Sequence, residues 1–119
     1  MGHYVEVPSE VIESFLSGKR FVRGVQGSEV VYSFAHLRDA AVKVKVYTSI
    51  RVGATRARGC GEDAIRVVVC GERPGRSWGI AKLPRVYRTG NVDAVLARLH
   101  ARMREAYTIA TNYLTAQRA

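Results

Sequence analysis

The sequence predicts an α+β fold in which an antiparallel sheet, made of a hairpin and a three-stranded meander, packs against a long C-terminal helix and a short N-terminal helix. Three observations predict it: apolar and polar residues alternate over 42–52, apolar residues recur at helical spacing over 92–113, and the loops between β-rich runs are short. Such loops exclude the crossovers that parallel strands require. The 119 residues, 47% of them hydrophobic, can bury a core, and we expect one domain over 1–119.

The first expected element is a short helix that begins at Ser9. Ser9 is a suitable N-cap, and Glu10 suits the positive end of the helix dipole. Apolar residues follow at helical spacing until Gly18, which is expected to end the helix. Two β-rich runs, 20–25 and 29–35, then predict a hairpin with a short glycine-containing loop.

Three further β-rich runs predict the meander. They cover 41–52, 63–70 and 78–88. Pro84 interrupts the last run, so this run is expected to be an edge strand or to bend there. For Trp78, at the start of the same run, two interpretations remain open: a core residue or a contact for a ligand.

The longest expected element is a helix that is capped by Asn91 and ends at about Gln117. Its apolar seam consists of Val92, Leu96, Leu99, Met103, Ala106, Ala110 and Tyr113. At 1.5 Å per residue this helix is about 39 Å long, slightly more than the width of a compact domain of this size. Two interpretations remain open: the whole seam covers the sheet, or the C-terminal end projects and forms a homo-oligomer.

The chain is strongly basic, with a formal net charge of +9. Most of its 19 basic residues lie after residue 50, and most of them are arginine, which forms bidentate contacts with phosphate. A charge excess of this size indicates a polyanionic partner. An acidic protein partner, and a basic surface without any such partner, are the alternatives; a GC-rich genome would also favour arginine.

The run at 41–52 places valines on one side of the expected strand. The opposite side carries Lys43, Lys45, Tyr47, Ser49 and Arg51, and no carboxylate. Lys, Arg, Ser and Tyr contact phosphates, and bases stack on aromatic rings. Arg66, in the next run, is expected on the same face. The sequence therefore predicts a nucleic-acid-binding surface here; a solvated face with protective edge lysines is the alternative.

Two more segments are expected to extend this surface. Arg56 and Arg58 lie among glycines, whose backbone allows N–H groups to approach an anion closely. This loop matches neither the P-loop nor the dinucleotide-binding pattern. The other segment interleaves basic and aromatic residues, as strand-binding surfaces do. Its members are Arg73, Arg76, Trp78, Lys82, Arg85, Tyr87 and Arg88, and the strongest phosphate candidates are Arg85 and Arg88, which flank Tyr87.

The sequence does not identify catalytic residues, a metal site or a cofactor. Asp39, Glu72 and the pair Glu62 and Asp63 could supply carboxylates to a metal-dependent nuclease, but no spacing marks them. The histidines and cysteines are too scattered to indicate a zinc site. We therefore expect a protein that is not an enzyme, with a small nuclease as a less favoured alternative.

The sequence also bears on location. The N-terminus lacks the apolar segment of a signal peptide, and no apolar run approaches the ~18 residues of a membrane span. Two cysteines do not make a disulfide framework. We therefore expect a cytoplasmic, intracellular protein with reduced thiols and no membrane contact.

The expected order of elements is helix, hairpin, short turn, three-stranded meander and long helix. This order resembles, in topology, the core of the single-strand annealing protein superfamily of phages and eukaryotic recombination, over most of 9–117. Members of that superfamily form oligomers and hold single-stranded DNA along a basic groove. The resemblance implies the same for this chain, with Lys43, Lys45 and Arg51 as groove candidates.

The segments 45–50 and 63–67 also look like pieces of small phage-encoded proteins, which implies no particular activity. Taken together, the residues and the resemblance predict a nucleic-acid-binding protein that binds or anneals single-stranded DNA. The alternative is a protein–protein interaction module, such as a phage-type inhibitor that docks on an acidic host protein through the seam of the C-terminal helix.

Overall fold

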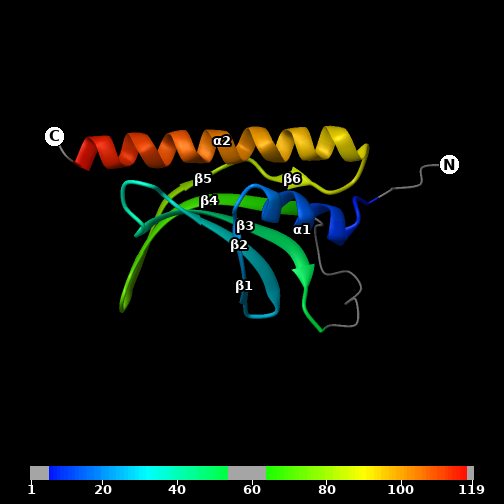
Figure 1. Ribbon diagram of the computed structural model, residues 1–119, viewed down its shortest axis with the longest axis horizontal. Coiled ribbons are helices and arrows are strands. Elements are labelled where there is room, and N and C mark those ends of the chain that lie inside the picture. The colour runs from blue at the N-terminus through cyan, green and yellow to red at the C-terminus, as the bar shows by residue number, and fades with distance from the viewer. Residues whose placement is uncertain (1–5, 54–63, 118–119) are drawn as a thin grey trace.

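A computed structural model describes residues 6–53 and 64–117 and arranges them as one antiparallel sheet with two helices (Figure 1). In chain order the elements are α1 (Ser9–Gly18), β1 (Val22–Gln26), β2 (Glu29–Ala35), β3 (Val42–Arg51), β4 (Ala64–Arg73), β5 (Arg76–Lys82), β6 (Val86–Tyr87) and α2 (Val92–Gln117). The strands β1 to β5 follow one another in the sheet as they do in the chain, and β6 pairs with β4 beyond the end of β5. The predicted fold class is confirmed; pairing of β2 with β3 joins the hairpin and the meander into one sheet.

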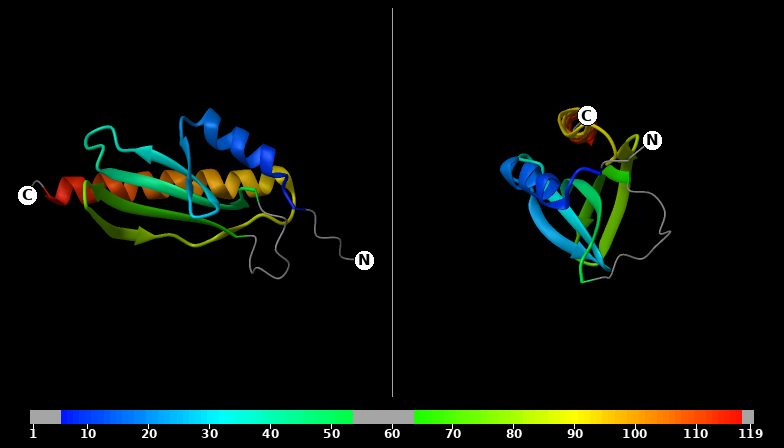
Figure 2. Two further views of the ribbon diagram at one scale, coloured as in Figure 1. Left: turned by 90° about the horizontal axis from the view of Figure 1, so that it is seen from below. Right: turned by 90° about the vertical axis from the view of Figure 1, so that its right-hand side faces the viewer.

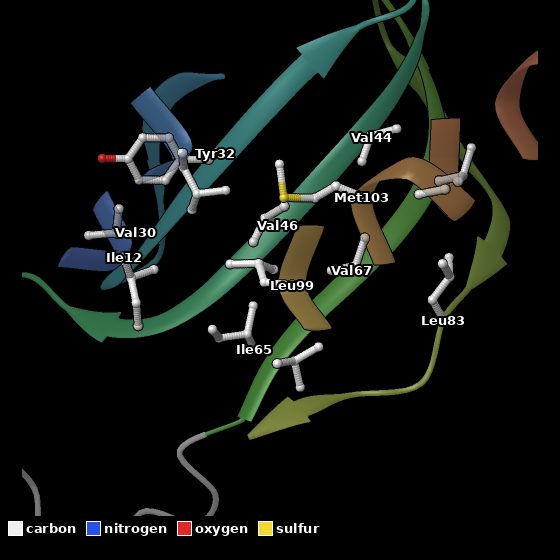
Figure 3. Packing of buried hydrophobic residues seen from close by; sticks show 14 of the residues in the cluster. Ile12, Val30, Tyr32, Val44, Val46, Ile65, Val67, Leu83, Leu99 and Met103 are labelled. Atoms are coloured by element: carbon white, nitrogen blue, oxygen red, sulfur yellow. The ribbon is translucent and has the colours of Figure 1, made fainter. Parts of the chain in front are cut away.

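Both helices of the described residues lie on the same face of the sheet (Figure 2). α2 packs across β3, β4, β5 and β6, and α1 adds Ile12 and Leu16 to the same buried cluster. The centre of this core is formed where Leu99 and Met103 of α2 meet the valines of β3 and β4 (Figure 3). Neither helix covers the opposite face of the sheet.

The strand β3 has the alternation that its sequence predicts. Val42, Val44, Val46 and Thr48 are buried, whereas the residues between them are partly exposed. The regular pairing with β2 is interrupted after Thr48 by a bulge, in which Ser49 has a φ of 62°. A carboxylate holds this bulge, because Ser49 N–H donates to Glu29 Oε2 at 2.9 Å. The strand therefore keeps its two faces while it bends.

The start of α1 differs from the prediction. Pro8 occupies the N-cap position and Ser9 is the first helical residue, so no side chain caps the helix. The hydroxyl of Ser9 is instead a hydrogen-bond acceptor for Arg88, at 3.2 Å. The Ser9 hydroxyl oxygen, which the sequence predicts to cap the helix, thus makes a tertiary contact with Arg88 instead.

The end of α1 falls at Gly18 as predicted, but the left-handed residue of the following turn is Arg20, with a φ of 69°. Phe21 N–H donates to Leu16 O at 3.2 Å and Arg20 N–H donates to Ser17 O at 3.1 Å. This pair of bonds is the Schellman motif, here with arginine in the place where glycine is usual. The turn brings Phe21 back against the core.

The helix α2 spans Val92–Gln117, as its sequence predicts, and Asn91 is its N-cap: Ala94 N–H donates to Asn91 Oδ1 at 3.1 Å. Its buried residues are Val95, Leu99, Met103, Ala106 and Ala110. In the first turn the buried residue is thus Val95 instead of the predicted Val92 and Leu96, which are half-buried.

The C-terminal turn extends past the end of the sheet (Figure 1), and the homo-oligomer stays a prediction. Within 6–53 and 64–117, neither helix is long and apolar enough to cross a bilayer.

The open question about Trp78 is answered by its contacts. Its indole Nε1 donates to Tyr113 Oη of α2 at 3.1 Å, and its ring lies against Gly71 on the neighbouring strand. The Arg76 guanidinium lies 4.9 Å from the centre of the ring. Trp78 therefore links the sheet to α2 on the helix-covered face.

Adding a methyl group at Gly71 should disturb this link. A Cβ at Gly71 would lie 2.1 Å from Cε2 of Trp78, whose ring is held by its hydrogen bond to Tyr113. We expect Gly71→Ala to lower the free energy of unfolding by about 2 kcal/mol, measured by urea denaturation. Gly79→Ala is the matched control, because a Cβ there meets nothing within 4 Å. Equal denaturation midpoints for the two variants would contradict this packing.

His36 is a buried titratable group between the sheet and α2. Its ring stacks on Tyr107 at 4.5 Å, its Nε2 lies 2.8 Å from Thr111 Oγ1, and its Nδ1 accepts Arg38 N–H at 3.1 Å. Burial lowers the pKa of His36, the charge of Arg38 lowers it further, and Asp39 opposes them in part. The ring is therefore held in its neutral form.

This geometry predicts a pH-dependent stability. Because the folded pKa of His36 lies below the ordinary value of 6.5, the unfolded chain takes up the proton first as the pH falls. The stability that the neutral His36 contributes is fully present at a pH above 6.5, and it is lost as the pH falls towards the folded pKa. Urea denaturation across this range should show a fall in stability that His36→Gln reduces and His100→Gln leaves in place. An equal slope in wild type and His36→Gln would contradict the assignment.

Candidate nucleic-acid interface

The candidate interface is the sheet face that the helices leave open. Ile65 and Val67 of β4 point to the core, so Arg66 between them points to the open face, and it is exposed. Directly paired residues of antiparallel strands point to the same side. The register places Tyr47 opposite Arg66, Lys82 opposite Val68, and Tyr87 opposite Ala64. Since alternate residues of a strand are ~6.8 Å apart, these side chains form a line along β4.

At the centre of this line, Arg66 and Tyr47 form a stacked pair. The guanidinium carbon of Arg66 lies 4.4 Å from the centre of the Tyr47 ring. Both side chains are held from the side: Tyr47 Oη donates to Gln26 Oε1 at 3.1 Å, and Arg66 Nη2 donates to Glu29 Oε1 at 3.0 Å. The Arg66 side chain remains 45% exposed. The pair therefore presents a partly exposed guanidinium over an aromatic ring, and a base can stack on either group.

A groove of about 460 Å³ runs beside this pair, between β4 and β5. Val68, Cys70 and Ile80 contribute apolar surface to it, with Lys82 at its edge. Gly79, which faces Cys70 across the pair of strands, adds no side chain, so the groove stays open. Burial raises the pKa of the Cys70 thiol, which favours its neutral form. The groove thus combines an apolar floor with two cations, Arg66 and Lys82, and no carboxylate of the described residues lines it.

Lys43 and Lys45 are less available than the sequence predicts. Both pair with Glu72 of the neighbouring strand: Lys43 Nζ lies 3.5 Å from Oε1, and Lys45 Nζ makes a short contact with Oε2. The hydrogen bond from Lys45 holds the pKa of Glu72 below its ordinary value; burial acts against the charge of Lys45, but Glu72 raises its pKa overall. Contact of these two lysines with phosphate stays a prediction, and one carboxylate already cancels half of their combined charge.

The remaining basic residues of the prediction have different positions. Arg51 is exposed at the end of β3 and donates to Ser28 Oγ at 3.2 Å. Arg85 is exposed on the connection between β5 and β6, and Tyr87 is 55% exposed on the open face. Arg56 and Arg58 lie outside the described residues. The structure thus brings Tyr47, Arg66, Tyr87 and Lys82 together along β4, while Arg51 lies at the end of β3.

Arg88 corrects the sequence prediction of a phosphate contact. Only 7% of this residue is exposed. Its Nη2 donates to Val7 O at 3.1 Å and to Ser9 Oγ at 3.2 Å, and its Nη1 lies 3.5 Å from Ser49 Oγ. The side chain therefore ties the end of β6 to the start of α1 and to the bulge of β3. Side-chain alternation explains this burial, because Tyr87 points to the open face and its two neighbours, Val86 and Arg88, are both buried.

Sequence reasoning also missed the two acidic residues that shape the surface. Glu29 holds Arg66 and the bulge at Ser49, and Glu72 holds the two lysines of β3. Only the strand register could have revealed these partners, because Glu72 is 27 residues from Lys45 in the chain. Within the described part of the chain no three His, Cys, Asp or Glu side chains gather as metal ligands, and Glu62 and Asp63, two of the carboxylates considered for a nuclease, lie outside it.

No family model, curated protein or solved structure matches this chain. The resemblance to single-strand annealing proteins therefore stays a prediction, and the function is argued from the geometry of the surface.

The burial of Arg88 can be tested through stability. Arg88→Ala removes hydrogen bonds to three oxygens and leaves a cavity between α1, β3 and β6. We expect a loss of about 3 kcal/mol in the free energy of unfolding, measured by urea denaturation. The control Arg51→Ala removes an exposed arginine and should change stability by less than about 0.5 kcal/mol. Equal, small effects would mean that Arg88 is at the surface.

Proposed function

We propose that the protein binds single-stranded nucleic acid across the open face of its sheet and does not catalyse a reaction on it. The observation that carries the proposal is the pair of Arg66 and Tyr47, in which a partly exposed guanidinium lies over an aromatic ring at the centre of that face. Bases of any identity stack on aromatic rings and on guanidinium planes, so such a pair suits a single strand. The exposed ring of Tyr87, on the same face, offers a second stacking surface.

The charge of the face supports the same ligand. Arg51 and Lys82 are exposed, and within 6–53 and 64–117 no ion pair joins either of them to a carboxylate. Arg66 is paired with Glu29, yet the exposed part of its guanidinium can still donate to a phosphate. The net charge of +9 adds a long-range attraction for a polyanion. Phosphates would thus be contacted by Arg51, Arg66 and Lys82, with little contribution from Lys43 and Lys45.

The shape of the face favours a single strand over a duplex. In a duplex the bases stack on each other, and a protein reads their edges by inserting a helix or a ribbon into a groove. Here both helices of the described residues pack on the opposite face of the sheet, and the candidate face is a row of side chains beside a shallow groove. A strand with unstacked bases fits such a surface, whereas a duplex would contact it only through phosphates.

The first test is the salt dependence of binding. Fluorescence anisotropy with a labelled single-stranded oligonucleotide should give an affinity that falls as salt rises. Three phosphate contacts predict a log–log slope of about −2, since each contact on a single strand contributes about −0.7. A duplex of the same sequence should bind more weakly, because it offers no bases to Arg66 and Tyr47. Tight binding that is independent of salt would refute the proposal.

The second test locates the site with matched variants. Tyr47→Leu should weaken binding about tenfold through lost stacking, and Lys82→Glu should weaken it similarly by reversing an unpaired charge. Arg98→Glu makes the same change of net charge on the exposed side of α2 and should leave the affinity nearly unchanged. Lys43→Ala should also change the affinity little, because Lys43 already forms an ion pair with Glu72. If Arg98→Glu weakens binding as much as Lys82→Glu, the open face is not the site.

A further inference from the structure

A second groove, of about 310 Å³, lies on the helix side of the sheet, beside α2 and the end of α1. Its floor consists of Phe21, Phe34, Val44, Met103 and Tyr107. The rings are in contact: the centroids of Phe21 and Phe34 are 5.4 Å apart, and those of Phe34 and Tyr107 are 5.8 Å apart. This floor is therefore an aromatic, apolar surface that is already assembled without a ligand.

The rim of this groove is basic. Lys19, His100 and Arg104 line it, and no carboxylate of the described part of the chain does. Within the described residues, no ion pair joins Lys19 or Arg104 to an acidic side chain. Lys19 Nζ instead lies over the ring of Phe15, 5.4 Å from its centre. An anionic group at the rim would therefore meet cations that are not already neutralised.

We propose that this groove binds a small amphipathic anion, with an apolar body on the aromatic floor and one carboxylate at the basic rim. The volume is at the lower end of the range for small-molecule sites, which are mostly apolar and carry a few polar groups that fix orientation. The ligand is a free carboxylate such as a fatty acid, because the groove has room for one apolar body and its rim offers two cations, Lys19 and Arg104, to one anionic head.

Two alternatives fit this groove less well. A base needs a flat ring to stack on, whereas the Phe21 and Phe34 rings are tilted by 42° and the Phe34 and Tyr107 rings by 75°. A protein partner usually covers a wider apolar patch. The large hydrophobic residues that are exposed in the described structure are Val22, Val25, Leu37, Val52 and Tyr87, and none of them lines this groove.

The first experiment uses two probes, anilinonaphthalene sulfonate and laurate. The fluorescent sulfonate should bind saturably at one site, and laurate should displace it. The double variant Lys19→Glu with Arg104→Glu should weaken both by at least about tenfold, because two exposed cations at the rim become anions. The control Arg98→Glu with Arg51→Glu makes the same change of net charge at two exposed residues away from the groove, and should change the affinity less than about twofold. Equal losses in the two proteins would overturn the proposal, because they would reflect net charge alone.

A second measurement on the unaltered protein keeps the test valid if the double variant does not fold. Laurate should shift the methyl resonance of Met103, on the floor of the groove, and leave the ring resonances of Tyr47 and Tyr87 in place. No shift at Met103 would overturn the proposal. A second result would also overturn it: an acidic, phenylalanine-containing peptide shifts Met103 while laurate does not bind. This result would assign the groove to a protein partner.

The two sites are independent. Tyr47→Leu, which should weaken binding of the oligonucleotide, should leave laurate affinity unchanged, because Tyr47 lies on the other face of the sheet. Loss of laurate binding in Tyr47→Leu would overturn the assignment to the helix-side groove.

Discussion

One-sided burial of the sheet organises this protein. In β3 and β4, alternate side chains are mostly valine or isoleucine, and α2 covers them with residues such as Leu99 and Met103. Because neighbouring residues of a strand point to opposite faces, burial of one set obliges the other set to face water. Tyr47, Arg66 and Lys82 therefore share a surface as a consequence of the packing behind them. Their proximity needs no attraction between the cations, which repel one another.

Cross-strand pairing then decides how much of this charge a ligand can use. Glu72 lies on the same face as Lys43 and Lys45 and pairs with both, so these three residues together keep one net positive charge. Towards the other end, one carboxylate, Glu29, faces Arg66 and leaves its guanidinium partly exposed over Tyr47. A strand with three cations in its sequence thus yields a surface whose available charge is concentrated away from the two lysines. The charge that a basic residue offers to a ligand therefore depends on the strand register, because the register decides which carboxylate pairs with it.

Each proposed surface lies beside a residue in the left-handed conformation that is not glycine. Arg20 precedes Phe21, which lines the groove under α2, and Ser49 lies two residues before Arg51 on the open face. This conformation costs about 1–2 kcal/mol for such residues, so the surrounding hydrogen bonds must hold it. The bond from Phe21 N–H to Leu16 O does so at Arg20, and the Glu29 carboxylate does so at Ser49. The hydrogen bonds that hold Arg20 and Ser49 in this conformation thus also fix the backbone beside the two proposed surfaces.

The amino-acid pattern alone determined the faces of β3, the extent of α2 and the cap at Asn91, because these depend on periodicity and on bonds between residues close in the chain. It did not determine that Arg88 is buried, that Glu72 pairs with two lysines, or that Ser9 accepts a hydrogen bond instead of capping α1. Those outcomes join residues that are tens of positions apart, and any of several strand registers would have satisfied the local pattern. Only the tertiary structure selected one register, since only it brings distant polar groups to within hydrogen-bonding distance.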